Sequence, residues 1–229
     1  MEQDLALCSA CLAELPILGE TCICCANPLE SHFTVLEGYL TESALLQTRH
    51  CGQCLQNPPY FDHSMAFFPY TSPFDYLVHA VKFSGKLATT QLLGGLMARQ
   101  ISQTIDGLND VPELLVAVPL HPSRLRERGY NQSFELARPI SKRLHIPLIT
   151  DLVQRIKSTS PQTSLSLRQR KTNLRDAFAI SYSVKGQHVA IIDDVMTTGS
   201  TVNSLAKTLK QAGARRVSVW CLCRAESPG

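Results

Sequence analysis

The 229-residue sequence has no run of 18 apolar residues, and we therefore expect no helix that crosses a membrane. It begins Met1-Glu2-Gln3-Asp4, which is acidic where a secretory signal is basic, so we expect a cytoplasmic protein. The G-x-x-x-x-G-K-[ST] loop of P-loop nucleoside triphosphatases is also missing. The single Gly-Lys pair, Gly85-Lys86, is followed by Leu87 and lacks the earlier glycine. These absences argue against an integral membrane protein and against a P-loop enzyme.

Excess charge of one sign is missing from the chain as a whole but not from its middle. The net charge is +3. Between His121 and Arg175, however, twelve Lys and Arg residues stand against three Asp and Glu residues, which leaves the rest of the chain at −6. A basic segment of this kind indicates a polyanionic ligand, either nucleic acid or a pyrophosphate-bearing molecule, unless it is simply a solvated face.

A short stretch near the C-terminus carries the clearest chemistry. Residues 189–192 form a continuous apolar run, which is typical of a central strand in a parallel sheet. Asp193 and Asp194 follow it, at the carboxyl end where open α/β sheets bind ligands. The next residues are small or hydroxyl-bearing and can surround a phosphate with N–H and O–H groups: Thr197, Thr198, Gly199, Ser200 and Thr201. The pattern predicts a phosphate site.

The flanking sequence predicts a βαβ unit. Residues 202–209 have helical spacing, Gly213 is placed to end that helix, and residues 217–222 read as the next strand. With a further strand at 114–118 and helices around 74–81 and 93–105, we expect an α/β domain with a mostly parallel sheet. Trp220, Cys221 and Cys223 are expected to be packing residues.

A basic segment follows the strand at 114–118. Pro119 and Pro122 end the strand, because neither can donate to a ladder hydrogen bond. Arg124, Arg126 and Arg128 alternate, and an extended loop would point all three guanidinium groups the same way, toward phosphate oxygens.

The string from Val189 to Thr201 resembles the phosphoribosyl diphosphate (PRPP) signature of type I phosphoribosyltransferases. That resemblance implies that Asp193 and Asp194 hold the ribose hydroxyls, that residues 197–201 hold the 5′-phosphate, and that Mg²⁺ accompanies PRPP. The short loop of Pro119, Leu120 and His121 looks like the family's pyrophosphate loop.

The string V-P-L-x-P-x-R-x-R-x-R-G-Y-N-Q-S at residues 118–133 resembles the ComF family more specifically. So do Lys82-Phe83-Ser84-Gly85-Lys86, residues 162–165 and the tail 219–224, so that the resemblance covers nearly the whole chain. It implies contact between single-stranded DNA and a set of basic and amide side chains: Arg124, Arg126, Arg128, Asn131, Gln132, Arg168 and Arg170. The stretch that includes Arg168 and Arg170 is equally consistent with a passive connector and with a lid or strand-binding arm.

Cysteine is abundant, with nine residues, six of them in C-x-x-C pairs. An odd number and this spacing suit a reducing compartment and metal binding better than disulfides. Each pair presents two thiolates, and two pairs complete a tetrahedral zinc site. A redox C-x-x-C is the alternative, but three clustered pairs argue against it. The three pairs are Cys8/Cys11, Cys22/Cys25 and Cys51/Cys54.

Spacing alone does not decide which two of these C-x-x-C pairs, or cysteine knuckles, share a metal. Neither the spacer at residues 12–21 nor that at residues 26–50 has the common length of about fifteen to twenty residues. The ComF resemblance, in which a zinc ribbon precedes the catalytic-type domain, favours structural zinc held by Cys22, Cys25, Cys51 and Cys54. Cys8 and Cys11 then lack partners, unless Cys24 joins them or the true start lies upstream. The competing set is Cys8, Cys11, Cys22 and Cys25.

The sequence thus predicts a cysteine-rich zinc-ribbon module over residues 1–57 and a phosphoribosyltransferase-like α/β domain over residues 58–229. Two functions follow from the resemblance. The first is handling of single-stranded DNA during DNA uptake or utilisation, alongside the uptake machinery. The second is Mg²⁺-dependent phosphoribosyl transfer to an unknown acceptor.

Overall fold

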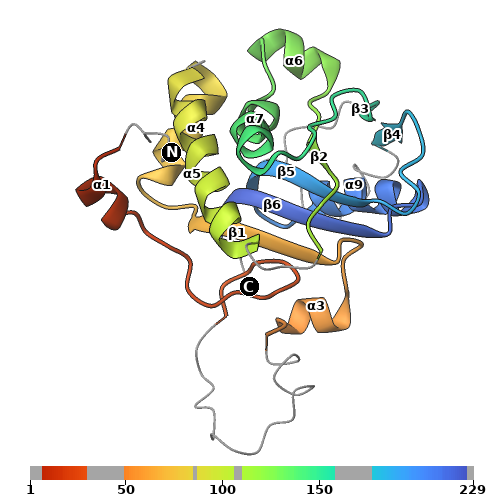
Figure 1. Cartoon of the computed structure of the whole chain (residues 1–229), viewed down its shortest axis with the longest axis horizontal. Helices are drawn as coiled ribbons and strands as arrows, with labels where there is room; N and C mark the ends of the chain where they lie inside the picture. The colour runs from red at the N-terminus through yellow and green to blue at the C-terminus, as the bar shows by residue number, and fades with distance from the viewer. Residues whose placement is uncertain (1–6, 30–48, 85–86, 106–109, 158–176, 226–229) are drawn as a thin grey trace, which may run out of the picture.

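The computed structural model describes residues 7–29, 49–84, 87–105, 110–157 and 177–225. Its centre is a four-stranded sheet in the order β1-β6-β5-β2, with every neighbouring pair parallel (Figure 1). The strands span His63–Pro69 (β1), Leu114–Ala117 (β2), His188–Met196 (β5) and Arg216–Arg224 (β6). The prediction of an α/β fold with a mostly parallel sheet is confirmed.

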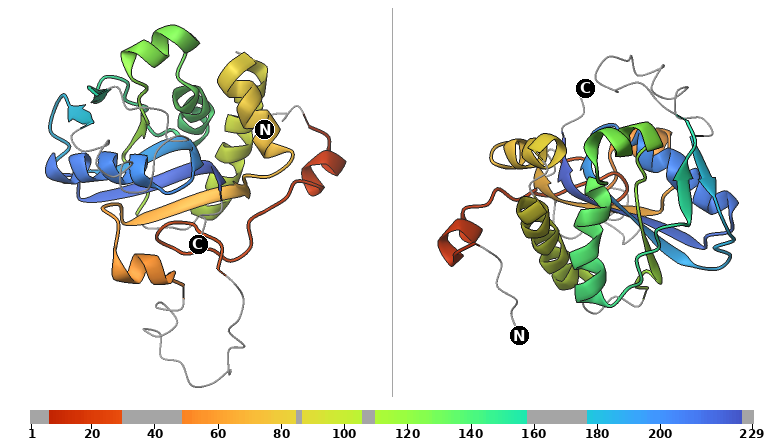
Figure 2. Two further views of the ribbon diagram at one scale, coloured as in Figure 1. Left: turned by 180° about the vertical axis from the view of Figure 1, so that it is seen from behind. Right: turned by 90° about the horizontal axis from the view of Figure 1, so that it is seen from above.

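Continuous apolar runs produce the central strands because both faces of the sheet are covered. On one face pack α4 (Phe74–Ser84), α5 (Leu87–Ile105) and α7 (Gln132–Leu144). On the other face pack α9 (Ser200–Gln211) and the antiparallel pair β3 (Val153–Arg155) and β4 (Phe178–Ile180) (Figure 2). Trp220, Cys221 and Cys223 are buried in these cores, as the sequence predicts.

Glycine permits one close helix contact. A Cβ atom on Gly94 of α5 would lie 2.9 Å from the carbonyl oxygen of Leu136 and 2.9 Å from the Cγ of Pro139 in α7. Only a residue without a side chain therefore lets α5 approach α7 this closely. The contact fixes α7, whose N-terminus borders the site described below.

The described part of the cysteine-rich segment, residues 7–29 and 49–57, includes the short helices α1 (Ser9–Ala13) and α3 (Gly52–Gln56). It is attached to the sheet through β1, where the Ser64 hydroxyl donates to the Cys24 carbonyl at 2.6 Å. The Ser64 N–H also donates to the Ile23 carbonyl at 3.3 Å. The boundary between residues 57 and 58 remains a prediction.

Candidate functional site

The acidic pair lies near the carboxyl end of β5, inside the strand and not just beyond it as the sequence suggested, because β5 continues to Met196. The Ser133 hydroxyl, on α7, donates to Asp193 Oδ1 at 3.0 Å, and the Asp194 N–H donates to the same atom at 3.0 Å. Burial, aided by the neighbouring charge of Asp194, raises the pKa of Asp193 to about 7. The Asp193 carboxylate is therefore held in a partly desolvated position where its charge is not fully compensated.

Lys82, on α4, supplies a cation to this pair. Its ammonium lies 2.9 Å from Asp194 Oδ2, and the two side chains are 26% and 8% exposed respectively. The sequence places Lys82 in a family-like motif but gives it no role, because the contact joins residues 112 positions apart.

The hydroxyl-rich turn after β5 has the geometry of an anion cradle. Gly199 adopts a left-handed conformation (φ 70°) and is the N-cap of α9. The hydroxyls of Thr198 and Ser200 lie 2.7 Å apart, and the Ser200 N–H donates to Thr198 Oγ1 at 3.3 Å. The first N–H groups of α9 and its dipole favour an anion here. A hollow at this position is lined by Asp193, Val195, Met196, Thr197, Gly199, Ser200, Thr201 and Val202.

The predicted pyrophosphate loop reaches the same edge of the sheet. Pro119, Leu120 and His121 follow β2, which is the parallel neighbour of β5. Asn131 holds this region together, since its amide donates to the Val118 carbonyl at 3.0 Å and its Oδ1 accepts from the Ser133 N–H at 3.1 Å. Asn131 thus joins the end of β2 to the helix whose Ser133 contacts Asp193.

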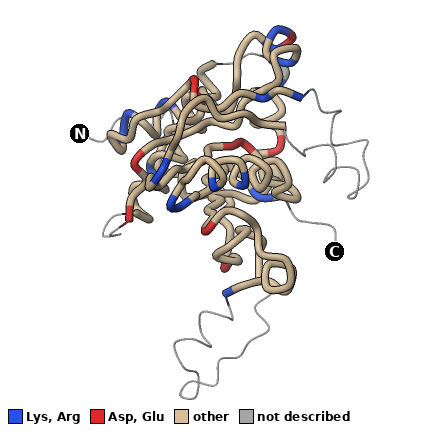
Figure 3. Tube along the Cα trace, turned by 90° about the vertical axis from the view of Figure 1, so that its right-hand side faces the viewer, with Lys and Arg blue, Asp and Glu red and all other residues tan. Residues whose placement is uncertain are grey.

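The expectation of an extended arginine loop is wrong. Residues Pro122–Arg128 form a helix, α6, with Pro122 at its first turn, His121 as N-cap and Gly129 in the left-handed region (φ 82°) at its end. A helix places Arg124 and Arg128 on one face and Arg126 on the other. α6 has no buried residues. Arg124 and Arg126 are exposed and Arg128 is half-buried, and the colours along the backbone trace of Figure 3 mark these basic positions.

The remaining predicted basic and amide residues differ in position. Gln132 is buried, and its amide oxygen accepts from Arg128 Nη1 at 2.6 Å, so Gln132 positions that arginine. Arg168 and Arg170 lie outside the described residues. Arg155 is a further arginine of the basic segment, to which the sequence analysis gave no role. It ends β3, with its guanidinium carbon 5.8 Å from the centre of the Phe178 ring.

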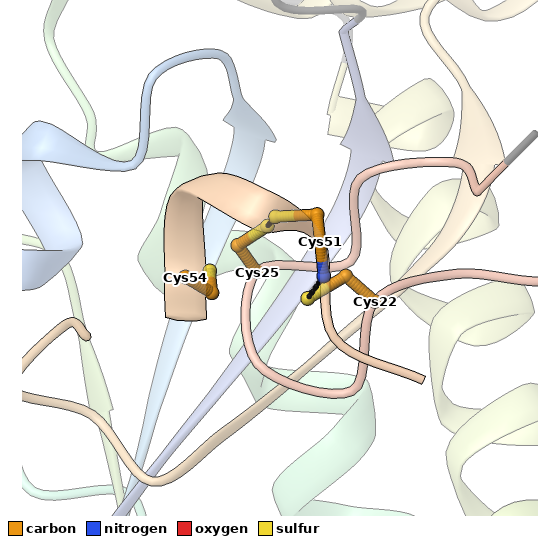
Figure 4. Close-up of side chains that lie close together, drawn as sticks. All are labelled: Cys22, Cys25, Cys51 and Cys54. Carbon is orange, nitrogen blue, oxygen red and sulfur yellow. Dashed lines mark hydrogen bonds between the residues drawn. The ribbon is translucent and has the colours of Figure 1, made fainter. Parts of the chain in front are cut away.

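Four cysteines converge from two knuckles, as Figure 4 shows. The sulfur atoms of Cys22, Cys25, Cys51 and Cys54 all lie within 4.8 Å of one another. The Cys51 N–H donates to Cys22 Sγ at 3.3 Å, and hydrogen bonds from Cys25 and Cys54 lower the pKa of the Cys22 thiol. Four thiolates at this separation fit a tetrahedral zinc ion and leave no open position for catalysis.

The structure does not bring Cys8 and Cys11 into this cluster. Both are exposed, at the start of α1. Cys24 does not join them, because it is buried with Cys22 and Cys54. The pairing favoured by the family resemblance is therefore the one the structure brings together, and the competing set with Cys8 and Cys11 is not formed.

Three residues at the site were assigned no role in the sequence analysis: Lys82, Ser133 and Arg224. Each reaches the acidic pair or the hydroxyl-rich turn from a distant element. All three lie within the family-like motifs of the sequence, at residues 82–86, 118–133 and 219–224, but those motifs gave them no role.

A family model described as the phosphoribosyl transferase domain matches residues 131–228. Together with the parallel sheet, this match shows that the α/β domain has the phosphoribosyltransferase fold. The structure of a hypoxanthine phosphoribosyltransferase from Staphylococcus aureus aligns with a TM-score of 0.39 and 15% identity, covering 58% of this chain and 64% of that one.

Curated relatives define the family more narrowly. The chain is 40% identical over 176 residues to the DNA utilization protein YhgH of Escherichia coli strain K12, covering 76% of this chain and 77% of that protein. It is 35% identical over 183 residues to competence protein F of Haemophilus influenzae, covering 77% and 79%. Competence protein ComFC of Bacillus subtilis is 24% identical over 229 residues, covering 98% and 86%. This chain belongs to the ComF family.

No helix among the described residues is long and apolar enough to cross a membrane.

Proposed function

We propose that this protein handles single-stranded DNA in the cytoplasm during DNA uptake or DNA utilisation. In this proposal its phosphoribosyltransferase-type site binds PRPP or the 5′-phosphorylated end of a strand. The names of its relatives, a DNA utilization protein and two competence proteins, support a role in DNA acquisition. Proteins of the DNA-uptake machinery are the expected partners.

The observation that carries the proposal is the common location of two anion-binding features. The hydroxyl-rich turn follows β5, and α6 follows the end of β2. Because β2 and β5 are parallel neighbours, both features lie at the same edge of the sheet. A strand whose terminal phosphate occupies the turn can therefore extend its next phosphates along the arginines of α6.

The chemistry of each group fits this role. Guanidinium groups bind phosphate oxygens through paired hydrogen bonds, which suits a backbone read without regard to sequence. When PRPP is the ligand, Asp193 and Asp194 offer acceptors to its ribose hydroxyls, and carboxylate oxygens are ligands that Mg²⁺ prefers. Mg²⁺, when bound with the ligand, supplies positive charge that offsets the phosphates. Zinc in the four-cysteine cluster has a structural role in this proposal.

A salt titration tests the DNA proposal. We expect the exposed pair Arg124→Gln/Arg126→Gln to weaken binding of an unstructured oligonucleotide several-fold and to reduce the slope of log affinity against log salt by about 0.7 per lost phosphate contact. The matched control is Lys142→Gln/Arg143→Gln, which removes the same charge from the exposed far end of α7. Affinity that is independent of salt, or equal losses in both variants, would refute the proposal.

A second candidate is phosphoribosyl transfer, favoured by the intact acidic pair and anion cradle. In this reaction positive groups stabilise the departing pyrophosphate while the carboxylates orient the ribose. The test is pyrophosphate release from PRPP and Mg²⁺ across a panel of nucleobases and amines. Transfer predicts release with at least one acceptor that Asp193→Ala abolishes, whereas no release with any acceptor counts against it.

A further inference from the structure

Arg224 lies between the four-cysteine cluster and the hydroxyl-rich turn. It is the last residue of β6 and is only 4% exposed. Its backbone neighbours are Met196 at the end of β5 and Pro69 at the end of β1. A charged side chain is rarely buried unless its donors are satisfied, so the partners of this guanidinium define what it does.

On one side the guanidinium holds the start of the anion-binding turn. Nη1 donates to the Met196 carbonyl at 2.8 Å and also to the Thr197 carbonyl. A phosphate cradle needs its N–H groups to face the anion and its carbonyl oxygens to face away, since those oxygens repel negative charge. Arg224 binds the carbonyl just before the cradle and the carbonyl of its first residue, and places a positive charge beside it.

On the other side the same guanidinium holds a cysteine knuckle. Nε donates to the carbonyl oxygen of Cys25 at 3.0 Å. Cys25 is one of the four clustered thiols, so a metal bound to its sulfur fixes the backbone that accepts this hydrogen bond. Because a guanidinium is planar and rigid, its Nε and Nη1 bonds cannot be redirected independently.

We propose that Arg224 is a positioning residue that couples metal occupancy of the Cys22, Cys25, Cys51 and Cys54 cluster to the conformation and anion affinity of the turn at residues 197–201. With metal bound, the Cys25 carbonyl anchors the guanidinium, which orients the turn. Without metal, the knuckle relaxes and the turn loses that anchor. The inference rests on the proposed anion site, but its structural part does not require any particular ligand.

Hydrogen exchange of the full chain tests the coupling without a ligand. We expect removal of zinc by a zinc-selective chelator to speed amide exchange at residues 198–201 by about tenfold, within the usual range of coupling between sites. In Arg224→Lys, which keeps the charge but cannot reach both sides, exchange there is already fast and changes little on zinc removal. The control is Arg216→Lys, at the other end of β6, which retains the wild-type response.

A ligand measurement supplies the reciprocal readout. Coupling requires that PRPP with Mg²⁺ tighten zinc binding to the wild type by the same factor by which zinc tightens PRPP binding. The inference would be overturned if amide exchange at residues 198–201 did not change on zinc removal. It would also be overturned if exchange in Arg224→Lys changed on zinc removal as it does in the wild type. If PRPP binds neither form while the exchange response persists, the proposed ligand is wrong and the coupling stands.

Discussion

The central sheet has an amino edge, where its strands begin, and a carboxyl edge, where they end. The pKa of a carboxyl group is shifted down at the first and up at the second. At the amino edge, Asp110 accepts from Arg216 Nη1 at 2.6 Å, from Arg215 Nη2 at 3.0 Å and faces His188 Nδ1 at 3.2 Å. The hydrogen bond from Arg215 and its neighbours hold the pKa of Asp110 well below its usual range. At the carboxyl edge, burial raises the pKa of Asp193 to about 7.

At the amino edge, the charge of a carboxylate is balanced by neighbouring cations. His188 Nε2 lies 2.8 Å from the Ser218 hydroxyl, which completes a Ser–His–Asp series with Asp110. Ser218 is only 4% exposed and His188 1%, so no substrate reaches them. The series therefore stabilises the ends of β5 and β6, although its order resembles a hydrolase triad.

The contrast indicates which carboxylate is stabilised when a ligand binds. A carboxylate whose charge is balanced stabilises the fold, whereas one that is buried with incomplete compensation costs stability until a ligand or metal arrives. Asp193 is of the second kind. The predictions below remove charges at the two edges and are ordered from the largest expected effect to the smallest.

Lys82→Met should destabilise the carboxyl edge most, by about 3 kcal/mol, because it leaves the carboxylate of Asp194 buried without its cation. Urea denaturation measures the loss. The double variant Lys82→Met/Asp194→Asn should recover most of it, since the uncompensated charge is then gone. A double variant no more stable than Lys82→Met would show that the ion pair is not the cause.

Asp110→Asn should destabilise the amino edge by about 1–3 kcal/mol, because buried and charged donors lose a charged acceptor. The pKa of Asp110 is lowered in the folded state, so its contribution is present above the unfolded pKa and is lost as pH falls through the folded value. The deficit of the variant in thermal denaturation should therefore shrink in acid. A deficit that grows in acid would contradict the assigned hydrogen bonds.

Asp193→Asn should have the opposite effect on stability and raise the melting temperature by a few degrees. The folded-state pKa of about 7 lies above the unfolded value, so the carboxyl group's favourable contribution is complete below the unfolded pKa and is lost as pH rises through about 7. The gain of the variant should be largest near and above neutrality and should vanish toward about pH 4. A variant less stable than the wild type at about pH 8 would refute this account.

Sequence reasoning worked best where the pattern is local. Continuous apolar runs predicted β2, β5 and β6, and the residues from Asp193 to Thr201 predicted the cradle, because both depend on neighbours along the chain. α6 was missed although Pro122 and Gly129 are ordinary helix start and stop signals, because the alternation of the arginines was read as an extended loop.

The missed contacts are all long-range. β1 was not predicted as a strand, since His63–Pro69 contains polar residues and ends in proline at the edge of the sheet. The pairing of Lys82 with Asp194 and of Arg224 with Cys25 depends on how α4 and the cysteine knuckle pack against the sheet. Residue spacing carries no information about such contacts.

The most direct test of the central claim is calorimetric titration of PRPP with Mg²⁺ into the zinc-loaded wild type, Asp193→Ala/Asp194→Ala and Asp110→Asn. The contrast between the edges predicts binding to the wild type and to Asp110→Asn, and none to the folded double variant. Absence of binding to the wild type, or equal binding to the double variant, would contradict a phosphoribosyl site at the carboxyl edge.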